Sequence, residues 1–350
     1  HLDRLTRVYE YMGPAWYQRE IEIPAAWKGK RIFLYFERTH WLSSVYVGKE
    51  EVSKIDYISI PHNHELTQWL HPGKKELITF CIDNRYQYDT HKWDHAHSEF
   101  TQINWNGVLG EIKLVAVDPV YVDDMQVYPD IKNKSIKVKM TVRNCTEHTA
   151  SGKISFHVTG KDYRLQKEVP VTVTDSITYI EEEMFLGKDI HLWNEFHPNL
   201  YTLDCKLTSS VEGQSYAHEK STTFGMREVE AGEDHIILNG EPIHLRGTVE
   251  NAVFPKTGYA PVDDASWERV LRILKEYGMN HMRFHSWCPP EAAFNVADRM
   301  GFYLQVELPL WTLNVGEDKG TVDFLYTEAA HIMKEYGNHP SFCFWSLGNE

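Results

Sequence analysis

The chain has 350 residues and a mass of 40.9 kDa, which leaves room for two or three domains of about 100–200 residues each. Hydrophobic residues make up 42% and charged residues 25% of the sequence, which is the balance of a globular protein and not of a disordered one. The net charge is −14, and so acidic a body repels phosphate groups, which argues against nucleic acid and anionic membranes as partners. No stretch approaches the roughly 20 consecutive apolar residues that span a bilayer.

The 5 cysteines are odd in number and scattered, without the paired spacing of a disulfide framework or a zinc site. Cys81 and Cys205 lie in alternating apolar stretches, so we expect them to be buried thiols. The cysteines therefore do not decide the redox compartment.

Residues 1–118 are predicted to form an all-β sandwich. Apolar side chains alternate with their neighbours over 32–36 and 77–82, and Gly48-Lys49 is a plausible hairpin turn. Period-two alternation interrupted by Gly, Pro and Asn is typical of short antiparallel strands. The alternation breaks at Pro119, where the next segment begins.

Residues 119–225 are predicted to form a second β-sandwich of the immunoglobulin-like class. The clearest strand is 136–142, where Ile136, Val138, Met140 and Val142 alternate with polar residues, and the pattern recurs over 154–158 and 201–207. About 100 residues of such strands fit an immunoglobulin-like sandwich, although the cysteine–tryptophan–cysteine spacing of antibody domains is absent.

Residues 226–350 change to an alternation of strands and helices. We expect strands at 243–248, 279–286, 302–308 and 341–347. Helices are expected from the Asp263–Ser266 region to Gly278, from Pro290 to Gly301, and over 325–337. This order predicts the first half of a (β/α)8 barrel or a doubly wound sheet, and no G-x-G-x-x-G follows the first strand to favour dinucleotide binding.

In such folds the reactive side chains lie at the carboxyl ends of the strands. Polar and aromatic residues follow each predicted strand: Arg246, Glu250 and Asn251, then Arg283, His285 and Trp287, then Glu307 and Trp311, then Asn349 and Glu350. Acids, a guanidinium, an imidazole and indoles at one rim suit a polyhydroxylated substrate, because carboxylates orient hydroxyls and tryptophans stack on sugar faces.

Some of these residues can be interpreted in another way. Arg283 could pair with Glu307 simply to fill the mouth of a barrel. His281, Arg283 and His285 alternate on one strand, which gives only weak support for a metal site. Trp345 lies in an apolar run and is expected in the core.

A histidine-rich segment contains His91, Asp94, His95 and His97 and could be read as a metal site. We expect instead a solvated loop that packs against the mouth of the barrel.

The segment 339–350, His-Pro-Ser-Phe-Cys-Phe-Trp-Ser-Leu-Gly-Asn-Glu, closely resembles the acid/base signature of glycoside hydrolase family 2, the β-galactosidase and β-glucuronidase family. Residues 224–227 resemble the family's entry into its barrel. The family's first three barrel strands are matched by 238–247, 278–283 and 301–307, and pieces of its sugar-binding jelly roll are matched by 16–19 and 83–85. The likeness runs nearly end to end and keeps the family's domain order.

This resemblance implies a jelly-roll sandwich over 1–118, an immunoglobulin-like sandwich over 119–225, and the amino-terminal half of a TIM barrel over 226–350. It also implies retaining hydrolysis by two carboxylates, with Glu350 as the general acid/base and Asn349 in contact with the sugar 2-hydroxyl. Arg283 and Glu307 match positions that line the site. The nucleophilic glutamate would belong to a later strand, so we expect the sequence to be part of a longer chain.

Three departures from the family pattern leave the sugar and any metal requirement open. The segment 247–255 replaces a histidine-rich one, and the histidine after Arg283 comes one residue early, as His285. After Glu307, Leu-Pro-Leu-Trp replaces the polar run that helps to hold magnesium in some β-galactosidases.

We therefore predict a retaining glycoside hydrolase of β-linked glycosides, with β-galactosidase as the first assignment. A β-glucuronidase or related exo-β-glycosidase is the alternative, and a noncatalytic carbohydrate-binding protein is the alternative of another class. The predicted catalytic residue is Glu350, and the predicted substrate-binding residues are Asn349, Arg283, His285, Glu307, Trp287, Glu250 and Asn251. No cofactor or metal ligand is assigned.

The expected partner is a carbohydrate on plant or host glycans, with neither nucleic acid nor membrane. Assembly into a homo-oligomer is left open. We expect a periplasmic or secreted protein and not a cytoplasmic one.

Overall fold

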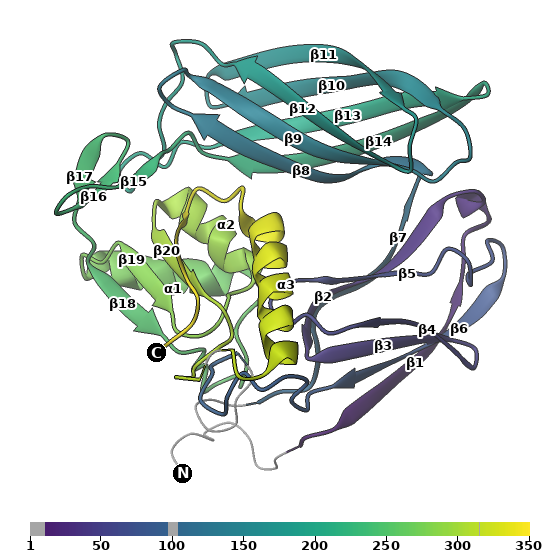
Figure 1. Cartoon of the computed structure of the whole chain (residues 1–350), viewed down its shortest axis with the longest axis horizontal. Coiled ribbons are helices and arrows are strands. Elements are labelled where there is room, and N and C mark those ends of the chain that lie inside the picture. The colour runs from purple at the N-terminus through teal and green to yellow at the C-terminus, as the bar shows by residue number, and fades with distance from the viewer. Residues whose placement is uncertain (1–10, 97–103, 315) are drawn as a thin grey trace.

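The computed structural model describes residues 11–96, 104–314 and 316–350. These residues form two antiparallel β-sandwiches followed by a parallel sheet flanked by helices (Figure 1). His97 of the predicted histidine-rich loop lies outside the described residues. None of the described helices is long and apolar enough to cross a membrane.

The first sandwich pairs a four-stranded sheet, ordered β1-β6-β3-β4, with a three-stranded sheet, ordered β5-β2-β7. Ile32, Leu34 and Phe36 alternate into the core between the sheets, as the sequence pattern predicts. Its strands are β1 (Pro14–Glu22), β2 (Arg31–His40), β3 (Leu42–Val47), β4 (Glu50–Ile55), β5 (His62–Glu65), β6 (Lys75–Asp83) and β7 (Gly107–Val117), with a 3₁₀ turn at Ala25–Trp27.

The second sandwich pairs the four-stranded sheet β11-β10-β13-β14 with the three-stranded sheet β12-β9-β8. The apolar residues of 136–142 are all buried, and Lys137 on the opposite face reaches Glu181 of the neighbouring strand at 3.0 Å. Its strands are β8 (Val120–Asp130), β9 (Ser135–Asn144), β10 (Ala150–Gly160), β11 (Tyr163–Val173), β12 (Ile177–Phe185), β13 (Tyr201–Val211) and β14 (Gln214–Phe224).

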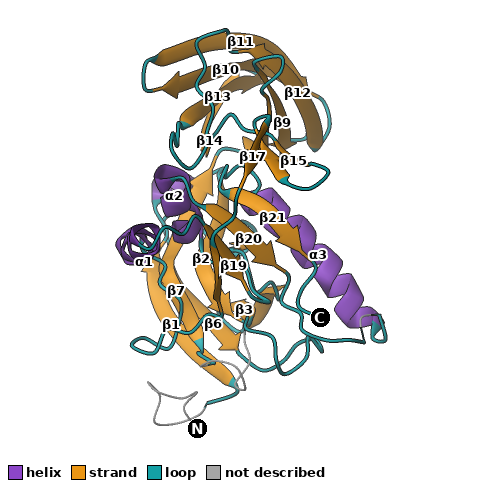
Figure 2. Cartoon of the chain, turned by 90° about the vertical axis from the view of Figure 1, so that its left-hand side faces the viewer, coloured by secondary structure: helices purple, strands orange, loops and turns teal. Residues whose placement is uncertain are grey.

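A small antiparallel sheet then leads into an open parallel sheet ordered β18-β19-β20-β21. Figure 2 shows α1 and α2 to the left of the labelled strands of this sheet and α3 to the right, behind β21. All three helices pack on the same face of the sheet, because their buried side chains share one core with Met282, Phe284, Leu304 and Val306. The elements are β15 (Val229–Ala231), β16 (Ile236–Leu238), β17 (Glu241–Ile243), β18 (Gly247–Glu250), α1 (Asp264–Glu276), β19 (His281–Phe284), α2 (Glu291–Met300), β20 (Tyr303–Glu307), α3 (Lys319–Tyr336) and β21 (Phe342–Ser346).

Two predicted elements differ from the structure. The strand expected over 243–248 is divided, because β17 ends at Ile243 in one sheet and β18 begins at Gly247 in another. Helix α3 begins at Lys319, six residues before the first apolar residue used to predict it, since the Asp318 side chain accepts from the backbone N–H of Thr321 at 2.7 Å and caps the helix there.

The first sandwich has a core of its own, and three of its residues, Trp41, Ile58 and Ile60, are buried in the core of the parallel-sheet domain. Trp41 of the sandwich is fully buried and its ring lies 5.4 Å from that of Phe324 on α3. Polar contacts join the same surfaces: Arg38 donates to the carbonyl of Cys288 at 2.6 Å, and Glu328 accepts from the backbone N–H of Ser59 at 2.7 Å. The sandwich is therefore held firmly beside the carboxyl ends of the parallel strands.

Candidate active site

The predicted site residues lie where the four parallel strands end. Glu250 ends β18, Arg283 lies in β19, Glu307 ends β20, and Asn349 and Glu350 follow β21. The strand register aligns Val249 with Arg283 and Arg283 with Gln305, and Glu307 with Ser346. Because the strands are parallel, their carboxyl ends and the residues that follow share one edge of the sheet.

A hydrogen-bonded network centred on Arg283 joins three of these strands. Nε of Arg283 donates to Oε1 of Glu307 at 2.5 Å, and Nη2 donates to Oδ1 of Asn349 at 2.9 Å. The other oxygen of Glu307 accepts from the backbone N–H of Ser286 at 2.8 Å, and its side chain is wholly buried. The pairing foreseen as the plainer alternative is thus present, and it leaves Glu307 behind Arg283 with both oxygens occupied.

Glu350 stands at the solvent side of this network. Its side chain is exposed, and Oε2 accepts from the indole Nε1 of Trp311 at 3.0 Å. The backbone before it is fixed, because the N–H of Asn349 donates to the carbonyl of Leu310 at 2.9 Å. Gly348 allows this close approach: a Cβ at that position would lie 2.6 Å from the same carbonyl oxygen.

The histidine-rich loop of the first sandwich packs against this edge, as predicted, but it is not solvated there. Asp94 and His95 are buried, and the backbone N–H of His95 donates to Oγ of Ser286 at 2.9 Å. Nδ1 of His95 lies 2.9 Å from Nδ1 of His285, so one ring must donate and the other accept. Burial lowers the pKa of His95 to about 4 and also lowers the pKa of His285, which keeps both imidazoles neutral at neutral pH.

Glu250, Asn251 and Trp287 lie at the β18 end of the edge. The carboxylate of Glu250 accepts from the backbone N–H of Ala252 at 2.7 Å, and burial raises its pKa to about 7. Trp287 is buried and donates to the backbone carbonyl of Glu250 at 3.2 Å, while Asn251 is half-buried. Sugar contacts by these three residues, and by His285 and Glu307, stay predictions.

Trp311 was predicted at a strand end, among the indoles suited to stack on a sugar, but not as a partner of Glu350. The contact of His95 with His285 was not predicted. The hydrogen bond from Trp311 to Glu350 joins residues 39 positions apart, and side-chain periodicity carries no signal for such a contact. Among the described residues no group of three or more histidines, cysteines or acids is arranged to hold a metal ion.

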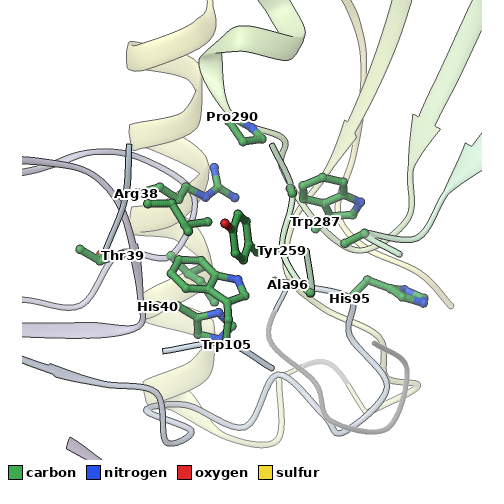
Figure 3. A pocket seen from close by; sticks show the side chains of 14 residues that line it. Arg38, Thr39, His40, His95, Ala96, Trp105, Tyr259, Trp287 and Pro290 are labelled. Atoms are coloured by element: carbon green, nitrogen blue, oxygen red, sulfur yellow. The ribbon is translucent and has the colours of Figure 1, made fainter. Parts of the chain in front are cut away.

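A small cavity lies between the first sandwich and the parallel sheet, beside His95. Figure 3 shows Arg38, Trp105 and Tyr259 close together around it, with Trp287 on the facing wall. Its volume of about 30 Å³ has room for about one water molecule. A sugar ring therefore does not fit inside it. The candidate substrate site is the edge of the sheet where Arg283, Asn349 and Glu350 lie together.

Two family profiles match the chain. The one described as "Glycosyl hydrolases family 2" matches residues 120–227, and the one described as "Glycosyl hydrolases family 2, TIM barrel domain" matches residues 229–350.

Similar curated proteins carry two different names. A β-galactosidase of Thermoanaerobacter pseudethanolicus is 23% identical over 97% of this chain and 45% of its own length. A putative β-glucuronidase of Formosa agariphila is 26% identical over 98% of this chain and 32% of its own length. The chain thus spans less than half the length of these relatives.

Solved structures share the fold. Bacteroides uniformis β-glucuronidase 2, covalently bound to cyclophellitol-6-carboxylate aziridine, superimposes with a TM-score of 0.82 at 19% identity, over 97% of this chain and 41% of that one. A putative β-galactosidase from Bacteroides fragilis gives a TM-score of 0.81 at 18% identity, over 100% of this chain and 52% of that one. Together with the two profile matches, the comparisons show that this chain belongs to glycosyl hydrolase family 2.

Proposed function

We propose that the chain carries the acid/base part of a retaining glycoside hydrolase that cleaves β-linked glycosides, with Glu350 as the general acid/base. The observation that supports this most directly is the position of its carboxylate. One oxygen is held by Trp311, next to an Asn349 that Arg283 holds in place. A carboxyl group held in a fixed orientation at the carboxyl end of a barrel strand is suited to give a proton to a leaving oxygen.

In this mechanism protonated Glu350 gives its proton to the glycosidic oxygen while the bond from that oxygen to the anomeric carbon breaks. A nucleophilic carboxylate forms the new bond to the anomeric carbon, and ionised Glu350 then takes a proton from the water that hydrolyses this intermediate. Glu307 does not suit the nucleophile, because its carboxylate is buried and both oxygens are occupied. We place the nucleophile on a later barrel strand, as the family resemblance implies.

A β-galactoside is the first candidate substrate. The guanidinium of Arg283 is already bound by Glu307 and Asn349, and an uncharged sugar needs no cation. A β-glucuronide is the second candidate, since relatives with that name are equally similar, and its carboxylate would need a basic partner from elsewhere in the protein. Carbohydrate binding without catalysis is the alternative of another class.

The test is Glu350→Ala in the full-length protein, assayed on a disaccharide and on a dinitrophenyl glycoside. General acid assistance is worth about 10²–10⁴-fold for a poor leaving group and little for dinitrophenolate. The variant should therefore lose far more glycosylation rate on the disaccharide. With the activated substrate deglycosylation should limit turnover, and azide, which needs no base, should restore it as a β-glycosyl azide.

Glu268→Ala removes an exposed carboxylate from α1 and serves as the matched control. Equal losses on both substrates without azide rescue would remove Glu350 from the catalytic role. A panel of 4-nitrophenyl β-glycosides that includes the β-galactoside and the β-glucuronide, assayed on the unmodified protein, then decides the sugar. No turnover of any of them would favour the noncatalytic alternative.

A further inference from the structure

We propose that Trp311 is a positioning residue for Glu350 and that a loop of the first sandwich, residues 88–96, holds Trp311 in place. This inference rests on the proposed function and extends it. The acid/base would then be oriented by two domains together, and the first sandwich would contribute to catalysis as well as to stability.

The indole of Trp311 determines which oxygen of Glu350 can carry the proton. Nε1–H donates to Oε2 at 3.0 Å, and in a protonated carboxyl group the carbonyl oxygen is the better acceptor, so the proton belongs on Oε1. Trp311 thereby directs the acidic O–H away from itself. The bond persists when Glu350 is ionised, as the water-activating step requires.

The backbone of Trp311 is fastened on two sides. Its N–H donates to the carbonyl of Thr90 in the sandwich loop at 3.3 Å. On the other side Trp311 forms a parallel bridge with Asn349, the residue next to Glu350. The sandwich loop therefore contacts Trp311, and Trp311 in turn contacts the end of β21.

Two imidazoles hold the indole ring. His95 of the sandwich loop stacks on it, with ring centroids 5.7 Å apart and an interplanar angle of 21°. His285 meets the same ring edge-on, with centroids 4.7 Å apart and an angle of 69°. With contacts on a face and at an edge, the indole has little freedom to turn its N–H away from Glu350.

The sandwich loop is itself anchored on the parallel-sheet domain. The ring of Tyr88 stacks on Phe324 at 4.4 Å, and the backbone N–H of Asp89 donates to Oγ1 of Thr321 at 3.0 Å. At the other end of the loop His95 is bonded to Ser286. Both ends of the loop are thus tied to the same domain as Glu350, so the loop can act as a rigid support.

The experiment uses Trp311→Phe in the full-length protein, because phenylalanine keeps an aromatic ring but has no N–H. The variant should lose about 10–100-fold in kcat/KM on a disaccharide, the scale of one hydrogen bond to a charged group. It should lose little on a dinitrophenyl glycoside. The alkaline limb of its pH–rate profile, where the general acid loses its proton, should shift to higher pH because the ionised form of Glu350 has lost a donor.

Trp267→Phe is the matched control, since Trp267 also donates its indole N–H, to the carbonyl of Pro261 at 2.7 Å, while its ring packs on Phe254 and Phe284. Its ratio of rates on the two substrates should stay that of the unmodified protein. A second pair tests the loop: His95→Ala should reproduce the substrate-dependent loss in weaker form, and His95→Phe, which can still stack, should restore much of it.

The outcomes separate this inference from the proposed function. If Glu350→Ala shows the leaving-group dependence but Trp311→Phe loses both substrates equally or neither, Trp311 has no positioning role and the inference is overturned while the function stands. If Glu350→Ala itself shows no such dependence, the proposed function fails and the inference fails with it. A substrate-dependent loss in both variants, absent from Trp267→Phe, supports it.

Discussion

The guanidinium of Arg283 binds the carboxylate of Glu307 at 2.5 Å, and the two residues differ sharply in exposure: the side chain of Glu307 is fully buried while that of Arg283 is 31% exposed. The pair joins β19 to β20, and Arg283 also donates to Asn349, the residue directly before Glu350. Its two members therefore support the candidate site in unequal ways.

Replacing Arg283 should destabilise the protein more than replacing Glu307. Arg283→Met leaves a buried carboxylate without its counter-charge, which typically costs about 3–5 kcal/mol. Glu307→Gln leaves only a partly exposed guanidinium and keeps an oxygen to accept from it, so the cost should be smaller by roughly 2 kcal/mol or more. Denaturant unfolding of the two variants measures the difference, and the reverse order would contradict this account of the pair.

Gly348→Ala should disturb the site through steric contact. Gly348 has φ 130°, and an added Cβ would lie 2.6 Å from the carbonyl oxygen of Leu310. Gly213→Ala, at φ 87° in the β13–β14 turn with no atom within 4 Å, is the matched control for backbone strain alone. The control should cost about 1–2 kcal/mol without loss of activity, whereas Gly348→Ala should cost more and lower kcat. Equal effects would mean that the close approach is unimportant.

Acid should weaken the first sandwich through two buried histidines. Nε2 of His62 donates to the carbonyl of Tyr57 at 2.9 Å, and Oγ of Ser43 lies 2.6 Å from His62 and 2.8 Å from His64. Burial lowers the pKa of His62 to about 4 and that of His64 to about 3. Because these pKa values are depressed, their contribution is complete above the unfolded pKa of about 6.5 and is lost as pH falls through the folded values.

The loss from His62 alone should be roughly 3 kcal/mol between pH 6.5 and pH 4. Thermal unfolding followed across this range should show the decline, and His62→Gln, which can still donate and accept, should flatten it. His148→Gln, an exposed histidine beside Glu212, should leave the slope unchanged. A slope that His62→Gln does not alter would exclude His62 as its source.

Glu250 should lower the stability of the protein as the pH rises, opposite to the effect of the two histidines. Its folded pKa is raised to about 7 by burial, so the stability it allows is complete below the unfolded pKa of about 4.3 and is lost as pH rises through 7. On going from pH 5 to pH 8, the free energy of unfolding of Glu250→Gln should rise by about 1–2 kcal/mol relative to that of the unmodified protein. This figure is reduced because Glu250 is partly exposed. Glu268→Gln on α1 should show no such gain, and its absence in Glu250→Gln would place the titration elsewhere.

Local sequence signals predicted the elements that follow local rules. Strict alternation placed 136–142 in a strand, and Asp263 and Gly301 were found at the start of α1 and the end of α2. These features depend on a few neighbouring residues, since side-chain period and capping act within one or two turns. The start of α3 was missed because its capping residue, Asp318, was not recognised.

The sequence by itself determined which chemical groups follow each parallel strand. Side-chain periodicity and capping residues predict the strands and helices locally, and the motif at 339–350 identifies the end of the fourth strand. Only the tertiary structure decided how those groups divide their roles. Packing placed Glu307 behind Arg283, joined Trp311 to Glu350, and brought His95 from another domain against Trp311. Such contacts arise when whole sheets and loops bury their apolar surfaces against one another, and no short-range pattern encodes which distant residue will then be adjacent.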